Sequence, residues 1–435
     1  MSARKAFRAT VAHCTDDPFN AGIDALQTID DALLVLNDGR VEALGNAQSL
    51  LDDNRYADVD VTDYRGYLIV PGFVDTHLHY PQTDIIASHG QQLLEWLEKY
   101  TFPAEKRFGD ETHALESADF FINELLRNGT TSGMIFASVH PQSVDALFSV
   151  AEQRNIRVGT GKVMMDRNCP PDLQDTAKQG YEDSQRLIDR WHGVARLSYA
   201  VTPRFAPTST DEQLRLAGKL YAENDGVYVQ SHVAENKAEV EWVAELFPWS
   251  KSYLDVYDHF GLLGERAIYA HCIHLTDADL ARMRETRTVA AFCPTSNLFL
   301  GSGLFDLQGA RNAGIRTGMA TDVGGGTSFS MLRTADEAYK VAQMSGNPVT
   351  PLQLFYEMTL GGARALSMQE YVGNFEVGKE ADFSVMDLAA SALLERRVSV
   401  ANTFEEKLFA MIVLGDDRCT RATYLMGEQA YAKDQ

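Results

Sequence analysis

Eight short apolar runs, separated by longer amphipathic stretches, follow one another through the middle of the chain. The runs occupy residues 69–76, 132–137, 156–163, 197–202, 227–231, 267–270, 289–292 and 315–320. The stretches between them have helical spacing; in residues 116–127, for example, the apolar positions 120, 121, 125 and 126 fall on one face. A strand followed by a helix, many times over, is typical of a parallel sheet with helices outside it. Eight such units predict an α/β fold, a (β/α)8 barrel with insertions.

An open, doubly wound parallel sheet would give the same alternation of strands and helices. Such sheets often carry a G-x-G-x-x-G motif at the first turn from strand to helix, where backbone amides bind phosphate. The turn after residues 69–76 has no such motif. The barrel is therefore the favoured interpretation.

Both ends of the chain have strand character. Residues 32–36 and 41–44 are apolar or alternating, and the Asp38-Gly39 pair between them is a strong hairpin signal because both residues tolerate positive φ. Residues 381–386 and 422–426 also predict strands. No repeat or low-complexity linker separates these ends from the middle.

The composition argues against several classes of function. Of the 435 residues 45% are hydrophobic and 23% charged, and 39 basic against 61 acidic side chains give a net charge of −22. An acidic body repels nucleic acid and anionic membrane surfaces, so neither is expected as a partner. The first residues lack the apolar run of a secretory signal, and no stretch has the ~18 apolar residues of a membrane helix. Five scattered cysteines do not suggest a disulfide framework, so a cytoplasmic protein is expected.

His77 and His79 follow the first apolar run and are the first indication of a metal site. Because a strand sends alternate side chains to the same face, the two imidazoles point together, and neutral imidazole is a favoured zinc ligand. An isolated pair of this kind also occurs as two polar residues at the end of a strand. His232, His271 and Asp322 change that balance, because each follows a later predicted strand. In a barrel these strand ends converge on one face, which predicts a catalytic zinc site with room for a water molecule.

Glu235 is the candidate general acid and base. It lies three residues after His232, in the loop above the predicted metal site. A carboxylate there can take a proton from a metal-activated water and deliver it to the leaving group. The alternative is a solvated residue that opens a helix predicted for residues 236–246, where the helix dipole favours an acidic side chain.

Several motifs resemble the amidohydrolase superfamily. They are residues 71–79 (PGFVDTHLH), the later ligand candidates and residues 378–383 (GKEADF), so the resemblance spans nearly the whole chain. Further segments are similar to the guanine deaminase branch of that superfamily: residues 79–82 (HYPQ), residues 93–105 with LLEWL and YTFPAE, and residues 202–207 (TPRFAP). Residues 292–297 (FCPTSN) are similar too, although other deaminases and chlorohydrolases share them.

The resemblance implies a distorted (β/α)8 TIM barrel at residues 69–370 and a small β-sandwich domain built from residues 1–68 and 371–435. It also implies a homodimer and one Zn2+ per chain, with iron as the alternative metal. The implied metal ligands are His77, His79, His232, His271 and Asp322. The implied catalytic residues are Glu235, Asp322 and His271.

A second metal is less favoured. Binuclear relatives bridge two metals with a modified Lys on the fourth strand, and residues 197–202 contain no Lys. Only Lys162, on the third predicted strand, leaves a second metal open.

The same resemblance implies guanine as the substrate, hydrolysed to xanthine and ammonia. A planar, polar purine fits an aromatic face, an amide that donates and accepts, and a cation for a carbonyl oxygen. Phe205, Gln82 and Arg204 supply these groups in that order, and His232 is a further substrate contact. Arg204 would select guanine over adenine, which presents an amino group at the same position. Without the resemblance, core packing for Phe205 and a surface salt bridge for Arg204 are the simpler interpretations.

Two other functions stay open. Aminohydrolases and chlorohydrolases acting on other heteroaromatic rings, such as pterins and triazines, share the fold and the metal; the combination of Gln82, Arg204 and Phe205 argues against them. The other is a barrel that binds without catalysis, and the complete set of ligand candidates argues against that. Trp96 and Phe102, in the long insertion after the first strand, are candidates for a lid or a dimer contact.

Overall fold

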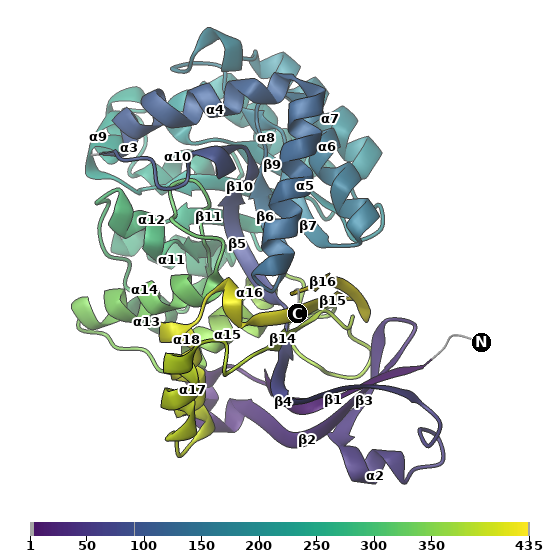
Figure 1. Cartoon of the computed structure of the whole chain (residues 1–435). Coiled ribbons are helices and arrows are strands. Elements are labelled where there is room, and N and C mark those ends of the chain that lie inside the picture. The colour runs from purple at the N-terminus through teal and green to yellow at the C-terminus, as the bar shows by residue number, and fades with distance from the viewer. Residues whose placement is uncertain (1–3, 91, 434–435) are drawn as a thin grey trace.

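The computed structural model describes residues 4–90 and 92–433 and has two parts, a barrel and a sheet made from both ends of the chain (Figure 1). Within these residues the barrel strands follow the order β13-β12-β11-β10-β9-β7-β6-β5, with β8 paired to β9. Their bounds are β5 Phe73–His79, β6 Thr130–Phe136, β7 Arg157–Gly161, β8 Val163–Met164, β9 Ser198–Pro203, β10 Tyr228–Val233, β11 Ala267–His271, β12 Val289–Phe292 and β13 Arg316–Met319. The predicted (β/α)8 barrel is confirmed.

Helices cover the outside of the barrel between successive strands (Figure 1). Over the whole of the described chain, barrel or not, the longer helices are α5 Glu111–Arg127, α6 Pro141–Arg154, α7 Ala177–Trp191, α8 Asp211–Glu223, α9 Lys237–Leu246, α11 Asp277–Thr286, α14 Met331–Met344, α15 Pro351–Met358, α17 Ala392–Ser399 and α18 Phe404–Leu414, the last two of which follow the barrel in the sequence. Shorter ones are α1 Pro18–Ala21, α2 Ala47–Leu51, α3 Leu93–Trp96, α4 Phe102–Lys106, α10 Tyr253–His259, α12 Pro294–Phe299, α13 Leu307–Asn312 and α16 Leu360–Ala365. The helix predicted at residues 116–127 begins earlier, at Glu111, because the Asp110 carboxylate caps it by accepting a hydrogen bond from His113 N at 2.9 Å.

The first apolar run of the sequence is divided between two strands. Residues 69–71 end β4 Asp60–Pro71, which belongs to the second sheet, and β5 starts the barrel at Phe73. Between them Gly72 lies against Thr131, where a Cβ would come within 2.0 Å of the hydroxyl oxygen. The chain therefore passes from one sheet to the other at a residue without a side chain. Hydrophobicity does not reveal this break, because the residues on both sides are buried.

Hydrogen bonds from β5 to the last residue of β13 and to the segment after it bring the two ends of the barrel together. Asp322 N donates to His77 O at 2.9 Å, and His79 N donates to Val323 O at 3.3 Å. The Thr76 hydroxyl donates to Met319 O at 3.0 Å. Since β13 ends at Met319, irregular backbone makes this closure and carries Asp322 to the strand that bears the two histidines.

The second sheet joins the two ends of the chain. In the described residues its strands follow the order β16-β15-β14-β4-β1-β2-β3. The remaining bounds are β1 Lys5–Cys14, β2 Leu26–Asn37, β3 Arg40–Asn46, β14 Phe383–Met386, β15 Thr420–Leu425 and β16 Glu428–Ala432. The predicted hairpin joins β2 to β3, with a φ of 51° at Asp38 and 74° at Gly39. The rings of Phe7, Phe383 and Tyr424 pack together in the core of this sheet, with centroids 4.6 to 4.9 Å apart.

Glu380 links the sheet to the barrel. It precedes β14 and accepts hydrogen bonds from Arg157 at the start of β7, from Nε at 2.9 Å and from Nη2 at 2.6 Å. Arg196, which precedes β9, forms an ion pair with the same carboxylate at 2.8 Å. All three side chains are buried. Removal of this carboxylate would take from the buried guanidinium of Arg157 its carboxylate partner, while Arg196 would keep its ion pair with Asp382.

Replacing Glu380 by Gln is expected to lower the free energy of unfolding by about 3 kcal/mol, because breaking a buried ion pair leaves uncompensated charge. Chemical denaturation of the variant and the wild type measures the loss. The control is Glu212→Gln, which removes an exposed pair with Arg215 and should leave stability unchanged, since exposed pairs contribute little. A Glu380→Gln protein as stable as the wild type would contradict this account of the link.

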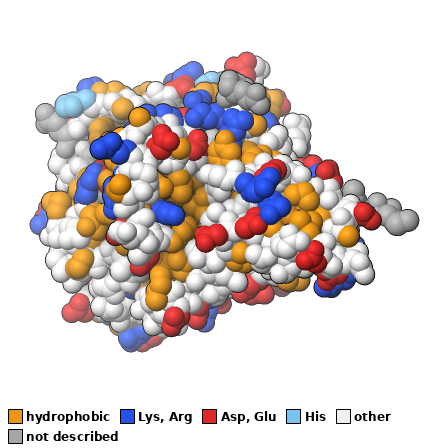
Figure 2. Space-filling model, turned by 60° about the horizontal axis from the view of Figure 1, so that its bottom comes forward, with side chains coloured by type: hydrophobic (Ala, Val, Ile, Leu, Met, Phe, Trp, Pro, Cys, Tyr) orange, Lys and Arg blue, Asp and Glu red, His pale blue; other side chains and the backbone are white. Residues whose placement is uncertain are grey.

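Charge on the surface is mixed in sign. On the face in Figure 2, basic and acidic side chains surround hydrophobic side chains that gather near the middle. The net charge of −22 is therefore not collected into one acidic patch there. Among the helices of the described residues, none is both long and apolar enough to cross a membrane.

Candidate metal and substrate site

Five side chains meet at the carboxyl end of the barrel. His77 and His79 lie at the end of β5, His232 lies in β10, His271 ends β11, and Asp322 follows β13. Four of them are buried and His232 is half-buried. The structure brings together every residue that the sequence predicted as a metal ligand, and each comes from the strand end where it was expected.

The donor atoms of these side chains surround one point. His79 Nε2 lies 3.2 Å from His77 Nε2 and 3.1 Å from His232 Nε2. Asp322 Oδ1 lies 3.3 Å from His77 Nε2 and 3.4 Å from His79 Nε2. On the other side, Asp322 Oδ2 lies 3.9 Å from His271 Nε2. Donor atoms of His77, His79 and His232 lie within 4.8 Å of one another, as do those of His77, His271 and Asp322, so the two overlapping groups form one candidate site for a cation.

The second ring nitrogen of two histidines fixes the orientation of the ring. His232 Nδ1 donates to the carbonyl oxygen of Arg204 at 2.7 Å. His271 Nδ1 donates to Asn297 Oδ1 at 2.9 Å. With the proton on Nδ1, each Nε2 keeps a free lone pair that faces the common point, which is the arrangement of metal-binding histidines.

This donor set fits a divalent metal ion. Burial lowers the pKa of His77 and lowers that of His79 to about 3, so both rings are neutral near pH 7. Burial alone would raise the pKa of Asp322, but hydrogen bonds from the two imidazoles hold it well below its usual range. Ligands of a tetrahedral zinc, with bonds of about 2.0 to 2.1 Å, lie about 3.3 to 3.4 Å apart. The separations of 3.1 to 3.4 Å between Nε2 of His79 and its neighbours are close to that spacing.

Strained backbone occurs at the strand ends that carry these residues. His271 has a φ of 72°, Asp322 has a φ of 50°, and Ala234, next to Glu235, has a φ of 51°. Residues with a Cβ seldom adopt this region, and a conformation costing about 1–3 kcal/mol persists only where the surroundings hold it. Strain of this kind is characteristic of functional sites.

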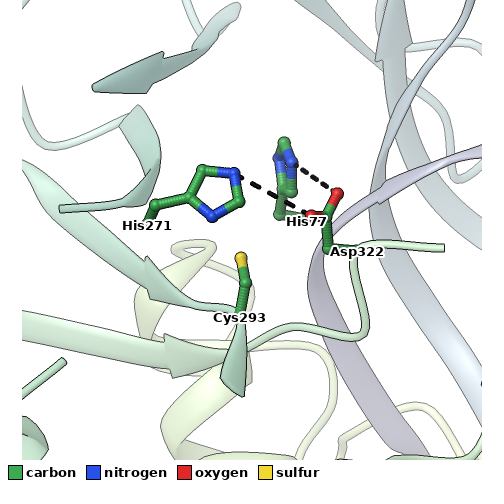
Figure 3. A group of neighbouring side chains, drawn as sticks. All are labelled: His77, His271, Cys293 and Asp322. Atoms are coloured by element: carbon green, nitrogen blue, oxygen red, sulfur yellow. Dashed lines mark ion pairs between the residues drawn. The ribbon is translucent and has the colours of Figure 1, made fainter. Parts of the chain in front are cut away.

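Cys293 lies directly beside the cluster. Donor atoms of His77, His271, Cys293 and Asp322 all lie within 4.8 Å of one another, and Figure 3 shows the sulfur pointing toward the gap between His271 and Asp322. Burial raises the pKa of the Cys293 thiol well above its usual value. The neutral thiol is a poor metal ligand, so we keep Cys293 outside the ligand set.

Glu235 lies at the mouth of the cluster, and its two oxygens have different surroundings. Ser302 Oγ donates to Oε1 at 3.0 Å. Oε2 lies 3.3 Å from His271 Nε2. Burial, and then the nearby carboxylate of Asp322, raise the pKa of Glu235 to about 8. A carboxyl group that titrates near neutrality can both give and take a proton, as the predicted general acid and base must.

A pocket beside the cluster contains the predicted substrate residues. Gln82, Arg204 and Phe205 line it together with Glu235 and four of the five ligand candidates, His79, His232, His271 and Asp322. The space between its walls, including its open mouth, is about 410 Å³. The surface salt bridge considered for Arg204 is excluded, because this side chain is only 2% exposed.

The insertion after β5 forms one wall of this pocket. Trp96, a candidate for a lid or a dimer contact, lines the pocket with Leu93 and Leu97. Phe102 lies behind that wall, with its ring centroid 5.6 Å from the guanidinium carbon of Arg204. The insertion therefore encloses the substrate residues.

Several residues that contact the site were not singled out from the sequence. Asn297, which the resemblance included only as part of residues 292–297, holds His271 in place, and Ser302 holds Glu235. Glu239 lines the pocket, and its Oε2 accepts a hydrogen bond from the backbone N–H of Glu235 at 2.9 Å. The capping-box spacing of residues 236–239 could have identified Glu239 as a helix cap. Ser302 had no signal, because nothing in its neighbourhood differs from an ordinary loop.

Lys162 points to a different part of the barrel. Its Nζ donates to Val163 O at 3.1 Å and pairs with Asp175 at 2.5 Å. Since this ion pair uses the ammonium group, the structure argues against a second metal held by Lys162.

A parallel barrel with histidine and aspartate ligand candidates at the carboxyl ends of its strands is typical of metal-dependent hydrolases. Comparison with known sequences agrees with that class. The sequence model of the amidohydrolase family matches residues 68–430. This chain belongs to the amidohydrolase family.

Particular members of that family are similar along nearly the whole chain. Guanine deaminase of Escherichia coli (strain K12) is 49% identical over 413 residues, which cover 94% of this chain and 93% of that protein. Its solved structure matches with a TM-score of 0.96 at 48% identity, covering 99% of this chain and 100% of that one. Guanine deaminase from C. acetobutylicum, with guanine bound in the active site, matches with a TM-score of 0.90 at 29% identity, covering 98% and 100%.

Proposed function

We propose that this chain hydrolyses guanine to xanthine and ammonia. The observation that carries the proposal is one pocket lined by metal-ligand candidates, by a carboxyl group with a pKa of about 8, and by Arg204, Gln82 and Phe205. The similarity to guanine deaminases over nearly the full chain supports the same substrate.

One divalent metal ion is part of the proposal. Neutral imidazoles and a carboxylate suit Zn2+, with iron as the alternative. Such an ion, when bound, lowers the pKa of water and activates it for attack. The residues that would hold it are His77, His79, His232, His271 and Asp322.

Glu235 moves the protons of the reaction. Its Oε2, the oxygen not held by Ser302, takes a proton from the attacking water and gives it to the ring nitrogen beside the carbon that bears the amino group. The same oxygen then takes the proton of the new hydroxyl group and delivers it to the amino group. Ammonia leaves, and a carbonyl group remains on the ring. Asp322 accepts a hydrogen bond from the water and keeps it beside His271.

The pocket recognises the purine by three contacts. Phe205 packs on the ring face, Arg204 donates to the carbonyl oxygen, and the amide of Gln82 binds the polar ring edge, with His232 as a further contact. Adenine has an amino group where guanine has this carbonyl, and two donors would then face each other. The pocket therefore favours guanine.

Replacing Arg204 by Gln is expected to lower kcat/KM for guanine about 100-fold, because a charge-assisted hydrogen bond to the carbonyl is lost. Metal content should change far less than activity, since Arg204 is not one of the five ligand candidates. Xanthine formation and metal content are measured on the same sample, with the exposed Arg215→Gln as control. Equal loss of metal and activity would contradict the assigned role. A metal-loaded wild type that releases no xanthine and ammonia from guanine would overturn the proposed function.

The proposal also covers organisation and location. We place the chain in the cytoplasm as a homodimer, with a barrel at residues 69–370 and a second domain from residues 1–68 and 371–435. The hydrophobic side chains on the face in Figure 2 support self-association. Light scattering on the purified protein measures the oligomeric state.

A further inference from the structure

Glu105 forms a fully buried polar group with two of the substrate residues. It lies in α4 Phe102–Lys106, in the insertion that follows β5, and its side chain is 0% exposed. Arg204 Nη1 donates to both of its oxygens, at 2.8 Å to Oε1 and 2.7 Å to Oε2. Gln82 Nε2 donates to Oε1 at 3.1 Å. One carboxylate thus holds the two side chains that read the polar edge of a purine.

The contact fixes which atoms of Arg204 face the pocket. The guanidinium is planar, so commitment of Nη1 to Glu105 sets the direction of its other donors. Among the described residues, Nε and Nη2 of Arg204 have no hydrogen-bond partner, and the side chain lines the pocket. These donors are left for a carbonyl oxygen of a ligand.

The same carboxylate also fixes the amide of Gln82. An ionised carboxylate only accepts hydrogen bonds, so the nitrogen of the amide must face Glu105 and the oxygen must face away. Gly324 lies on the oxygen side, where a Cβ would come within 2.1 Å of Gln82 Oε1. The amide therefore has one orientation, with its nitrogen on Glu105 and its oxygen toward Gly324.

The ion pair between Arg204 and Glu105 also reduces the net positive charge at this wall of the pocket. Arg204 is the cationic side chain among the pocket residues, which also include the acidic side chains Glu235, Glu239 and Asp322. Paired with Glu105, it offers directed N–H groups with little net charge. A site of this kind suits a neutral ring that carries a carbonyl group.

We propose that Glu105 is a positioning residue that sets base selectivity by orienting Arg204 and Gln82. This inference rests on the proposed function and extends it: the pocket takes neutral 6-oxopurines, and a residue that does not line the pocket determines that choice. A purely structural ion pair would affect stability and not selectivity, so the two roles can be separated.

The test compares two ligands that differ in the carbonyl group. Hypoxanthine carries the carbonyl, and unsubstituted purine does not. In Glu105→Gln the KM for guanine should rise about tenfold with kcat nearly unchanged, because the new amide can accept or donate and no longer fixes either partner. The ratio of the inhibition constant of purine to that of hypoxanthine should fall about tenfold, because the contact of Arg204 with the carbonyl group exists in hypoxanthine alone. Glu105→Asp keeps a carboxylate acceptor. Its KM for guanine and its ratio of inhibition constants should lie between those of Glu105→Gln and those of the wild type.

Glu380→Gln is the matched control, because it also removes a buried carboxylate paired with arginine, but far from the pocket in the structure. It should lower Tm without changing the ratio of inhibition constants. When Glu105→Gln is added to the variant Arg204→Gln, the ratio of inhibition constants should change little. Glu105 is proposed to act mainly by orienting Arg204, and that side chain is already absent. If Glu105→Gln does not fold, the ratio is read from Glu105→Asp.

An unchanged ratio in the Glu105 variants, with Tm lowered as in the control, would overturn the inference and leave Glu105 as a structural residue. That outcome is distinct from failure of the proposed function, which is read from guanine turnover by the wild type alone.

Discussion

Glu235→Gln is expected to lower kcat for guanine about 1,000-fold while the bound metal stays the same. The amide keeps the size of the side chain and the hydrogen bond from Ser302, but it cannot carry a proton at the position of Oε2 beside His271. Both proton transfers of the proposed reaction use that atom. Steady-state xanthine formation, with metal quantified on the same sample, measures the two quantities.

The matched control for this variant is Glu241→Gln, an exposed residue on helix α9, which follows Glu235 in the chain. It should retain the kcat of the wild type. A Glu235→Gln enzyme within tenfold of the wild type would show that another group moves the protons. A loss of activity that tracks a loss of metal would assign Glu235 to metal retention instead.

Removal of the metal is expected to abolish turnover and to lower the free energy of unfolding by about 4 kcal/mol, for an ion present at about 1,000 times its dissociation constant. The reason lies in the cluster itself, where imidazole and carboxylate donors face one another at 3.1 to 3.9 Å. These donors come together only in the folded chain, so the ion binds the folded state and stabilises it. Dialysis against a chelator, followed by calorimetry and a turnover assay, measures both effects, and added zinc should restore them.

Two variants sharpen this test. His271→Ala should stay inactive when zinc is added, because a donor is missing. His140→Ala, which changes a histidine outside the pocket lining, should respond to the chelator as the wild type does. Full activity with less than about one metal ion per ten chains would contradict a metal-dependent mechanism.

The positions of the candidate ligands could be predicted from the sequence because each one follows a local signal. His232 and His271 lie at the ends of short apolar runs, and in a parallel barrel all such ends share one face. This prediction needed only the position of each residue relative to its own strand, and no knowledge of how distant loops pack. The passage at Gly72 could not be predicted, because the strands on both sides of it have the same apolar character.

The supports of the site needed the three-dimensional structure. Ser302 and Glu235 are 67 residues apart, and Arg204 and Glu105 are 99 residues apart. Each of these contacts joins loops or insertions from different units of the barrel, and neither periodicity nor spacing reports on such pairs. The resemblance placed Gln82 and Arg204 in a purine pocket, but the direction in which their polar atoms point came from the contact with Glu105.

The sheet built from both ends of the chain bears on how the protein is made. Strand β4 lies between β1 and β14, and it leads through Gly72 into the strand that carries His77 and His79. On the ribosome β4 lacks one neighbour until residues 383–386 have emerged, when most of the chain has already been translated. Contacts so distant in sequence form slowly, because a long loop must close first. Completion of the metal site is therefore expected late in folding, once residues 383–386 have paired with β4, and acquisition of the ion is expected to depend on β14.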